Sequence, residues 1–282
     1  MIEERRNRAS GWKHAKLSGH SNEARVKELL DSSPEYLSDF LHRIGYGNET
    51  VSSISIGGLH ETNVASVTGR STKSKTDLRI YCNSGRTVNV SIKKSFDGQV
   101  YLVQAKQFIQ VFEAQFGKHI PDDVQRAIKL FWAAADDAPE IIAAFGDRSD
   151  EKNFHLQMRH RSLNATTLEA YDKHLFHALR DWFAENAYEL TRLSFSMGAA
   201  ADESEWSEFV WYINLLDEND VDEIFPIEDI CRSAAAVAEE RTCYGRKNGG
   251  TTIQLPFGSV QWHQRKLEFR HSYESLDLLT TF

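Results

Sequence analysis

Two stretches of alternating polar and apolar residues lie before the middle of the chain. They are Thr76-Asp-Leu-Arg-Ile-Tyr-Cys82 and Thr87-Val-Asn-Val-Ser-Ile-Lys93, and alternation with a period of two is typical of β-strands with one buried face. Between them lies Asn83-Ser-Gly-Arg86, a turn-forming cluster of hairpin length. The sequence therefore predicts two antiparallel strands joined by a tight turn.

Other segments repeat their apolar residues with helical spacing. A first helix is predicted from about Ser21, with Ser21 or Asn22 as its cap. A second is predicted within 103–116 and a third over 166–188, where Thr166-Thr-Leu-Glu169 has the spacing of a capping box. The aromatic residues along these stripes are expected to form core.

A buried strand is predicted over 209–216, and the C-terminal part of the chain shows three further strand-like stretches. These begin at residues 251, 259 and 266. Strands and helices thus mix along the sequence, which predicts an α/β (α+β) fold with strands at the centre, helices packed around them and a β-rich C-terminal region.

Charge is sorted unevenly along the chain. The 282 residues carry a formal net charge of −8, which alone argues against a nucleic-acid partner. Between Gly69 and Lys94, however, there are seven basic residues and one acid, Asp77. Between Arg241 and His271 there are six basic residues and one acid, Glu268. Two basic blocks on an acidic body suggest a groove for a polyanion, although such clusters are also common on plain solvated surface.

Several classes of function find no support in the sequence. Three cysteines without C-x-x-C spacing predict neither a disulfide framework nor a zinc site, and indicate buried thiols in a reducing compartment. No apolar stretch is long enough to suggest a membrane span or a secretory leader. The nucleotide-binding and hydrolase glycine motifs are missing as well.

The predicted hairpin carries the residues that suggest chemistry. Ser91 and Lys93 are two apart on one strand and so face the same side, and pairing can bring Asp77 of the other strand beside them. A carboxylate can hold Mg²⁺, with the carbonyl of Ile92 as an additional ligand, and a lysine can position an attacking water. Such a group suits phosphodiester cleavage. The alternative is an exposed Asp–Lys pair across two strands, which is the more common arrangement.

The segment Thr68-Gly-Arg-Ser-Thr-Lys-Ser-Lys-Thr-Asp77, followed by Val90-Ser-Ile-Lys-Lys-Ser95, resembles the active-site segment of the PD-(D/E)XK nucleases. Among them it is similar to the type II restriction endonucleases of the MspI and HinP type, which cut short palindromes. These enzymes have a neutral amide residue in place of the usual second acid, and here Ser91 takes that place. The resemblance implies a restriction-endonuclease-like core, with Asp77 and Ile92 as Mg²⁺ ligands and Asp77, Ser91 and Lys93 as catalytic residues.

The resemblance extends in order along the chain. Gly19-His-Ser-Asn-Glu23 resembles the opening of the first helix in that family, which implies a catalytic or second-metal carboxylate at Glu23; an ordinary acid in a helix is the alternative. The implied organisation is a catalytic core over 1–120, its continuation over 121–240 and a DNA-recognition region over 241–282, or all three as one domain. The implied products carry a 5′-phosphate and a 3′-hydroxyl. The implied setting is the cytoplasm of a prokaryotic cell, with a cognate DNA methyltransferase in the same system.

Double-stranded DNA is the expected partner, bound by a monomer or a homodimer. Side chains that bond guanine, adenine or neighbouring pairs are abundant near the C-terminus. The strand alternation predicts that Gln261, His263 and Arg265 share one face and that Trp262, Gln264 and Lys266 share the other. Phosphate contacts are expected from Lys73, Lys75 and Lys94. The remaining predicted DNA-binding residues are Gln99, Arg246 and Lys247.

Two rival interpretations stay open. One is a structure-selective repair nuclease or resolvase on the same fold, which would bind branched or nicked DNA without sequence preference. The other is a DNA-binding protein without activity, in which Ser91 marks a missing acid. The recognition sequence, the position of the cut and the number of metal ions do not follow from the sequence.

Overall fold

The structure is a computed structural model that describes residues 8–57, 63–216, 221–245 and 250–280, with side chains from residue 19 onward. Its helices are α1 (Arg8–Ser32), α2 (Pro34–Arg43), α3 (Ala105–Phe116), α4 (Asp122–Phe131), α5 (Ala138–Phe145), α6 (Glu151–His160), α7 (Ala165–Tyr171), α8 (Lys173–Glu185), α9 (Ala187–Arg192), α10 (Ile227–Ala236), α11 (Ala238–Arg241) and α12 (Tyr273–Thr280). Its strands are β1 (Val51–Ile56), β2 (Val64–Ala65), β3 (Ser71–Thr72), β4 (Leu78–Cys82), β5 (Thr87–Lys93), β6 (Asp97–Gln104), β7 (Phe209–Ile213), β8 (Asp222–Pro226), β9 (Cys243–Tyr244), β10 (Thr252–Leu255), β11 (Gly258–His263) and β12 (Lys266–Ser272).

The first sheet is mixed and has the order β1-β4-β5-β7-β8. The strands β4 and β5 form the predicted antiparallel hairpin, with Leu78 opposite Val90, and β5 pairs in parallel with β7. Gly85 has a positive φ of 88° in the hairpin turn, a conformation that glycine adopts without strain. The alternation of the two sequences thus produces the hairpin, and the apolar run of β7 lies buried beside it.

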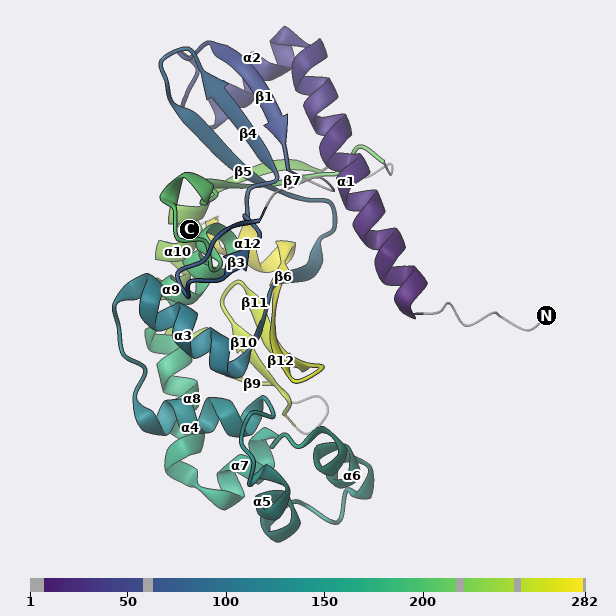
Figure 1. The fold of residues 1–282 in the computed structure, drawn as a ribbon, viewed down its shortest axis with the longest axis vertical. Coiled ribbons are helices and arrows are strands. Elements are labelled where there is room, and N and C mark those ends of the chain that lie inside the picture. Colours follow the sequence, from purple (N-terminus) through teal and green to yellow (C-terminus); the bar gives the residue numbers. More distant parts are fainter. Residues whose placement is uncertain (1–7, 58–62, 217–220, 246–249, 281–282) are drawn as a thin grey trace, which may run out of the picture.

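The two faces of the first sheet pack against different cores. One face, which includes Val90 and Trp211, packs with Val26 of α1 and Phe40 of α2. The opposite face carries Tyr212 into the larger core, which also holds the second sheet and most of the helices. In Figure 1, α1 and α2 lie beside the upper sheet and the second sheet lies below it.

The second sheet is antiparallel and has the order β6-β12-β11-β10-β9. Its strand β6 comes directly after β5 in the chain, whereas the other four strands come from the C-terminal region. Phe269 and Val260 lie in the main core against the helices, and Gln261 and Glu268, on neighbouring paired positions, face the other way. The sheet therefore has one apolar face covered by helices and one polar face.

The predicted mixed α/β fold, with a central sheet flanked by helices and a β-rich C-terminal region, is confirmed. Several boundaries were wrong. The first helix begins at Arg8 and not near Ser21, and the segment 166–188 divides into α7, α8 and the start of α9. Asn164 caps α7 by accepting from Thr167 N, so the predicted capping box is not the cap. Cys243, expected to be buried, is exposed.

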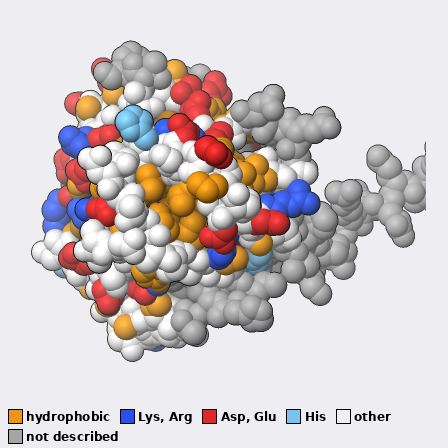
Figure 2. Space-filling view, turned by 90° about the horizontal axis from the view of Figure 1, so that it is seen from above, with side chains coloured by type: hydrophobic (Ala, Val, Ile, Leu, Met, Phe, Trp, Pro, Cys, Tyr) orange, Lys and Arg blue, Asp and Glu red, His pale blue; other side chains and the backbone are white. Residues whose placement is uncertain are grey.

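The end of the molecule formed by α1, α2 and β1 has a mixed surface where its side chains are described (Figure 2). Seen from above, it shows apolar side chains near its middle with acidic side chains around them and only scattered basic ones (Figure 2). Within the described part of the chain, no helix is both long and apolar enough to cross a membrane.

Candidate active site

Asp77, Ser91 and Lys93 lie together at one end of the β4–β5 hairpin. The hydroxyl of Ser91 donates to Asp77 Oδ2 over 3.0 Å, and Lys93 Nζ donates to Ser91 Oγ over 2.7 Å. Lys93 Nζ lies 3.9 Å from Asp77 Oδ2. Ser91 is 2 % exposed, so its hydroxyl is shielded from solvent while it bonds both neighbours. The structure thus brings the three residues together, as the strand spacing in the sequence predicted.

Strand register explains how these residues meet. Asp77 directly precedes β4 and its N–H donates to Val90 O over 2.9 Å, while Lys93 is the last residue of β5. Side chains at odd positions of both strands point away from α1 and α2, because Leu78 and Val90 point toward them. The acid and the base thus share one face and one end of the hairpin.

The oxygens at this end suit a small hard cation. Asp77 Oδ2 accepts from Ser91 Oγ and from Ile92 N at 2.8 Å, and Asp77 Oδ1 accepts no hydrogen bond from any described residue. The carbonyl of Ile92, the residue whose N–H donates to Asp77 Oδ2, accepts from Lys93 Nζ over 3.4 Å. Within the described residues, no three His, Cys, Asp or Glu side chains gather closely enough to hold a metal. This donor set fits Mg²⁺, which takes one or two carboxylates and keeps several waters, and it does not fit zinc.

Glu23 belongs to the same site. Burial, and after it the nearby carboxylate of Asp77, raises the pKa of Glu23, while hydrogen bonding to His20 works against this rise. His20 Nδ1 lies 3.0 Å from Glu23 Oε2. The carboxylates of Glu23 and Asp77 therefore lie close enough to interact electrostatically, and a catalytic or metal-binding role for Glu23 stays a prediction.

Asn22 fixes α1 in this place. Its side chain is fully buried; its Nδ2 donates to Ile213 O and its Oδ1 accepts from Leu215 N, both over 2.8 Å. Because β7 runs parallel to β5, Ile213 lies at the same end of the sheet as Lys93. The sequence suggested Asn22 only as a helix cap; in the structure it is within the helix and anchors that helix to the site.

Lys75 does not lie where a phosphate contact was expected. Its ammonium donates to Val100 O and lies 4.6 Å from the ring centre of Tyr101. Val100 has no partner in β12, because the register shifts there. Its carbonyl can therefore accept the hydrogen bond from Lys75. Burial, and then the nearby charge of Lys93, lowers the pKa of Lys75 to about 7. This lysine is part of the wall behind the site.

A buried pair on the inner side of the site had no signal in the sequence. Tyr212 OH and His271 Nδ1 are 2.5 Å apart, and they join the first sheet to the second. Burial, followed by the charges of Lys93 and Arg270, lowers the pKa of His271 to about 3. His271 is therefore neutral at physiological pH, and the two sheets are locked together beside Lys93.

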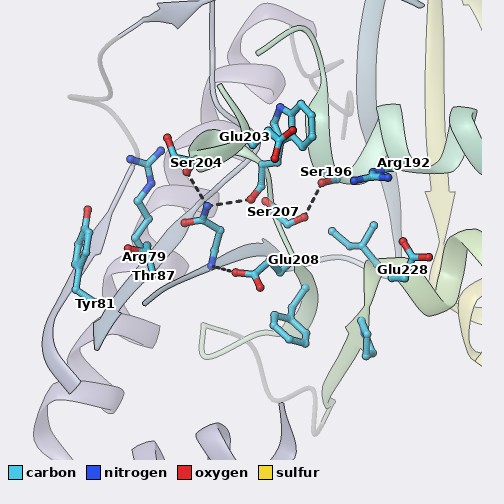
Figure 3. Close-up of a pocket in the computed structure, with 15 residues that line it drawn as sticks. Arg79, Tyr81, Thr87, Arg192, Ser196, Glu203, Ser204, Ser207, Glu208 and Glu228 are labelled. Atoms are coloured by element: carbon cyan, nitrogen blue, oxygen red, sulfur yellow. Dashed lines mark hydrogen bonds between the residues drawn. The ribbon is translucent and has the colours of Figure 1, made fainter. Parts of the chain in front are cut away.

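A pocket of about 700 Å³ lies further along the same face of the hairpin (Figure 3). Arg79 forms an ion pair with Glu205, and Asn89 Nδ2 donates to Ser204 O and Trp206 O over 2.8 and 2.9 Å. These bonds hold the segment before β7 across the hairpin. The pocket lies toward the hairpin turn, away from Asp77 and Lys93, and these bonds indicate a structural role for its walls.

The polar face of the second sheet is organised around Glu268. This side chain is buried; it accepts from Gln261 Nε2 over 2.8 Å and from Arg270 over 3.2 Å, and His263 Nδ1 lies 3.5 Å away. Arg270 also donates to Asp97 over 2.7 Å. One carboxylate thus orients three side chains that can bond bases, and Gln99 is exposed opposite Arg270 on β6.

The alternation predicted through the C-terminal block ends earlier than expected. Gln264 and Arg265 both have positive φ, 49° and 63°, and form the two-residue turn between β11 and β12. A turn of this kind matches the twist of the strands. Arg265 therefore does not share a strand face with Gln261, and Lys266 begins β12 opposite His263. Gln264 and Arg265 are exposed at the tip of the hairpin.

The remaining predicted contacts are on the surface or outside the described chain. Lys73 is exposed in the loop before the site, and Lys94 is half-buried directly after Lys93. Arg246 and Lys247 lie outside the described residues. The site residues that sequence reasoning missed are His20, which is three residues before Glu23 on α1, and Tyr212 and His271, which become neighbours of the site only through packing between distant segments.

Comparison with known proteins gives a likeness among solved structures. No protein-family model matches the sequence, and no curated protein matches it. Among solved structures, the chain is similar to restriction endonuclease MspI in complex with its cognate DNA. The identity is 13 % and the TM-score 0.40, over 90 % of this chain and 82 % of that chain. At this level of likeness no activity passes to the present chain.

Proposed function

We propose that this chain is a Mg²⁺-dependent endonuclease that hydrolyses duplex DNA at a short specific sequence, in the manner of type II restriction enzymes. The observation that carries the proposal is the contact between Asp77, Ser91 and Lys93. An exposed cross-strand ion pair would leave its charges in water, whereas here Lys93 and Asp77 converge on a serine that is 2 % exposed. That arrangement supports a catalytic role for the two charged groups.

Each residue has a task that its position supports. Lys93 Nζ would donate to a non-bridging phosphate oxygen as that oxygen gains charge, and would hold the attacking water for in-line displacement. Ser91 Oγ would keep Lys93 Nζ and Asp77 Oδ2 in place, since it bonds both. Glu23, when ionised, would bring a second carboxylate toward the same point.

The oxygens of Asp77 and the carbonyl of Ile92 would hold Mg²⁺. When bound, the ion supplies positive charge to the phosphate and acidifies the attacking water. The mutual repulsion of Glu23 and Asp77, which helps to raise the pKa of Glu23, is the kind of unfavourable interaction that a cation relieves. Ser91 contributes no charge, so binding of the ion is expected to be weak without DNA phosphates.

The polar face of the second sheet would read the bases. Gln261, His263 and Arg270 are held by Glu268 before any ligand arrives, and amide and guanidinium groups bond the edges of adenine and guanine. Orientation in advance reduces the entropy lost on binding. Lys73 and Lys94 would contact phosphates and give affinity without sequence preference.

A second candidate function is DNA binding without cleavage. It is favoured by Ser91, which replaces an acid, and by the absence of a cluster of three metal-binding side chains among the described residues. In that case Asp77 and Lys93 would be a structural pair. This candidate predicts binding that does not depend on a divalent ion.

One experiment separates these functions. Purified protein is incubated with long natural duplex DNA in Mg²⁺ or in EDTA, beside the Asp77→Asn variant, and the fragment ends are mapped. Discrete fragments only with Mg²⁺ and only from the unmodified protein support the proposal, and the ends give the recognition sequence. A smear indicates a non-specific or structure-selective nuclease. Intact DNA in all lanes, with binding retained, supports the second candidate.

A further inference from the structure

A small pocket lies at the tip of the β11–β12 hairpin, between α6 and the helical side of the second sheet. Its volume is about 180 Å³, and its walls include Gln157, His160, Ser162, Asn164, Thr251 and Trp262. A water molecule occupies roughly 30 Å³ of liquid, and drug-sized ligands take about 300 Å³ or more. The pocket therefore suits a single small group.

Two buried carboxamides present donors to this pocket. Gln157 is 5 % exposed and Asn164 is 4 % exposed. Gln157 Oε1 accepts from Asn164 N over 3.1 Å, and Asn164 Oδ1 accepts from Thr167 N over 2.8 Å. Because a backbone N–H fixes each oxygen, the amino group must be at the other end of each carboxamide. Neither amino group donates to any described residue, and neither is among the fully buried atoms that lack a partner. Both are therefore open to a ligand that presents acceptors.

The pocket also has a flat aromatic wall and a positive rim. The rings of Trp262 and His160 stack with centroids 4.0 Å apart and planes 9° apart, and Trp262 Nε1 has no partner among the described residues. Arg159 and Arg265 lie near enough to His160 to lower its pKa, after the effect of burial. An aromatic surface, unsatisfied donors and nearby cations are the features that hold a base and its phosphates.

We propose that this pocket receives one thymine base turned out of duplex DNA, with its two carbonyl acceptors on Gln157 and Asn164. The proposal rests on the proposed function, since DNA is then the ligand of the neighbouring polar face. DNA on that face would reach the pocket around the hairpin tip, where Gln264 and Arg265 are exposed. Arg159 and Arg265 would hold the phosphates that flank the base.

The test compares three DNA duplexes that differ at one point. The first is fully paired, the second has one unpaired thymine, and the third has in its place difluorotoluene, which has the shape of thymine without its acceptors. Binding is measured by fluorescence anisotropy in EDTA. The thymine bulge is expected to bind about tenfold more tightly than the difluorotoluene bulge, as two hydrogen bonds would give.

Isosteric variants test whether the pocket causes the preference for thymine over difluorotoluene. Gln157→Glu and Asn164→Asp keep the oxygen that accepts from the backbone and replace the donor with a second oxygen, so the helix cap is retained. Each is expected to abolish the preference for thymine over difluorotoluene. Thr166→Asp is the matched control, because it adds the same charge at an exposed position close in sequence. It should leave the preference intact, and circular dichroism confirms that all three variants fold.

The outcomes separate this inference from the function on which it rests. Equal binding of the thymine and difluorotoluene bulges overturns the pocket assignment. So does a Thr166→Asp variant that loses the preference for thymine as fully as Gln157→Glu does. Either result counts against the pocket even when natural DNA is cut at discrete sites. Absence of binding to all three duplexes overturns both. A thymine preference carried by Gln157 and Asn164 in a protein that cuts no DNA supports the pocket and refutes the nuclease.

Discussion

Lys75 gives a prediction about stability that can be worked through in numbers. Its ammonium lies against Val100 O and over the Tyr101 ring, where burial lowers its pKa from 10.5 to about 7. In the unfolded chain the same lysine is solvated and titrates near 10.5. Between these two pH values the unfolded state binds more protons, so the free energy of unfolding rises with pH.

The size of the effect follows from the two pKa values. A difference of about 3.5 units, at about 1.4 kcal/mol per unit, corresponds to a full range of about 5 kcal/mol. Roughly half of this, about 2–3 kcal/mol, falls between pH 6 and pH 9. Lys75→Met removes the titration. The difference in free energy of unfolding between the variant and the unmodified protein should therefore be about 2–3 kcal/mol more in favour of the variant at pH 6 than at pH 9.

Urea denaturation at pH 6, 7.5 and 9, followed by circular dichroism, measures this difference. Loss of the hydrogen bond to Val100 O changes the free energy of unfolding of the variant by the same amount at every pH. It therefore leaves the pH dependence of that free energy unchanged. Lys106→Met, at an exposed position of α3, is the control. It keeps Lys75, so its difference in stability from the unmodified protein should be the same at pH 6 and at pH 9. A Lys75→Met difference that stays within about 0.5 kcal/mol from pH 6 to pH 9 would show that Lys75 is solvated in the folded protein and would refute the reasoning.

Four further substitutions test the site and the fold. Lys93→Met should reduce the cleavage rate by about 10²- to 10⁴-fold in a single-turnover assay, and gel-shift affinity should change only a few-fold. Asp77→Asn should remove cleavage at every Mg²⁺ concentration; recovery at high Mg²⁺ would show that Asp77 is not an essential ligand. Asn22→Ala loses two buried hydrogen bonds to the end of β7, so urea denaturation should show a loss of about 2–4 kcal/mol, with cleavage reduced as α1 loosens. Gly258→Ala would place a Cβ 2.2 Å from a carbonyl oxygen of β12 at a φ of +149°, and its melting temperature should fall by several degrees or more.

The hairpin and its site were predictable because their signals are local. Alternation decides which side chains share a face, and the interval between Asp77 and Lys93 is short enough for a tight turn to fix the register. The contact of Ser91 with both residues then follows from geometry. The role expected for Glu23 rests on family resemblance alone, because no local pattern connects residue 23 with residue 93.

The parts that sequence reasoning missed depend on contacts between distant segments. Lys75 looks like a surface cation in a basic loop, and only the irregular register at Val100 creates the carbonyl that draws it inward. Tyr212 and His271 are ordinary strand residues until two sheets pack together. Alternation also placed Arg265 on the wrong face. Gln264 and Arg265 form a two-residue turn, and this turn contains no glycine that would have indicated it in the sequence.

The connection between the two sheets bears on how such an enzyme would relate the bases it reads to the bond it cuts. Lys93 ends β5, and β6 begins at Asp97, which binds Arg270 of the polar face. The Tyr212–His271 contact joins the same two sheets on the inner side. If Lys93 acts on the phosphate and Gln261 and Arg270 read the bases, their separation is set by packed strands and not by a flexible linker. A loosened Tyr212–His271 contact should then blur the position of the cut, and end-mapping of a Tyr212→Phe variant would detect this as a spread of cleavage positions around one site.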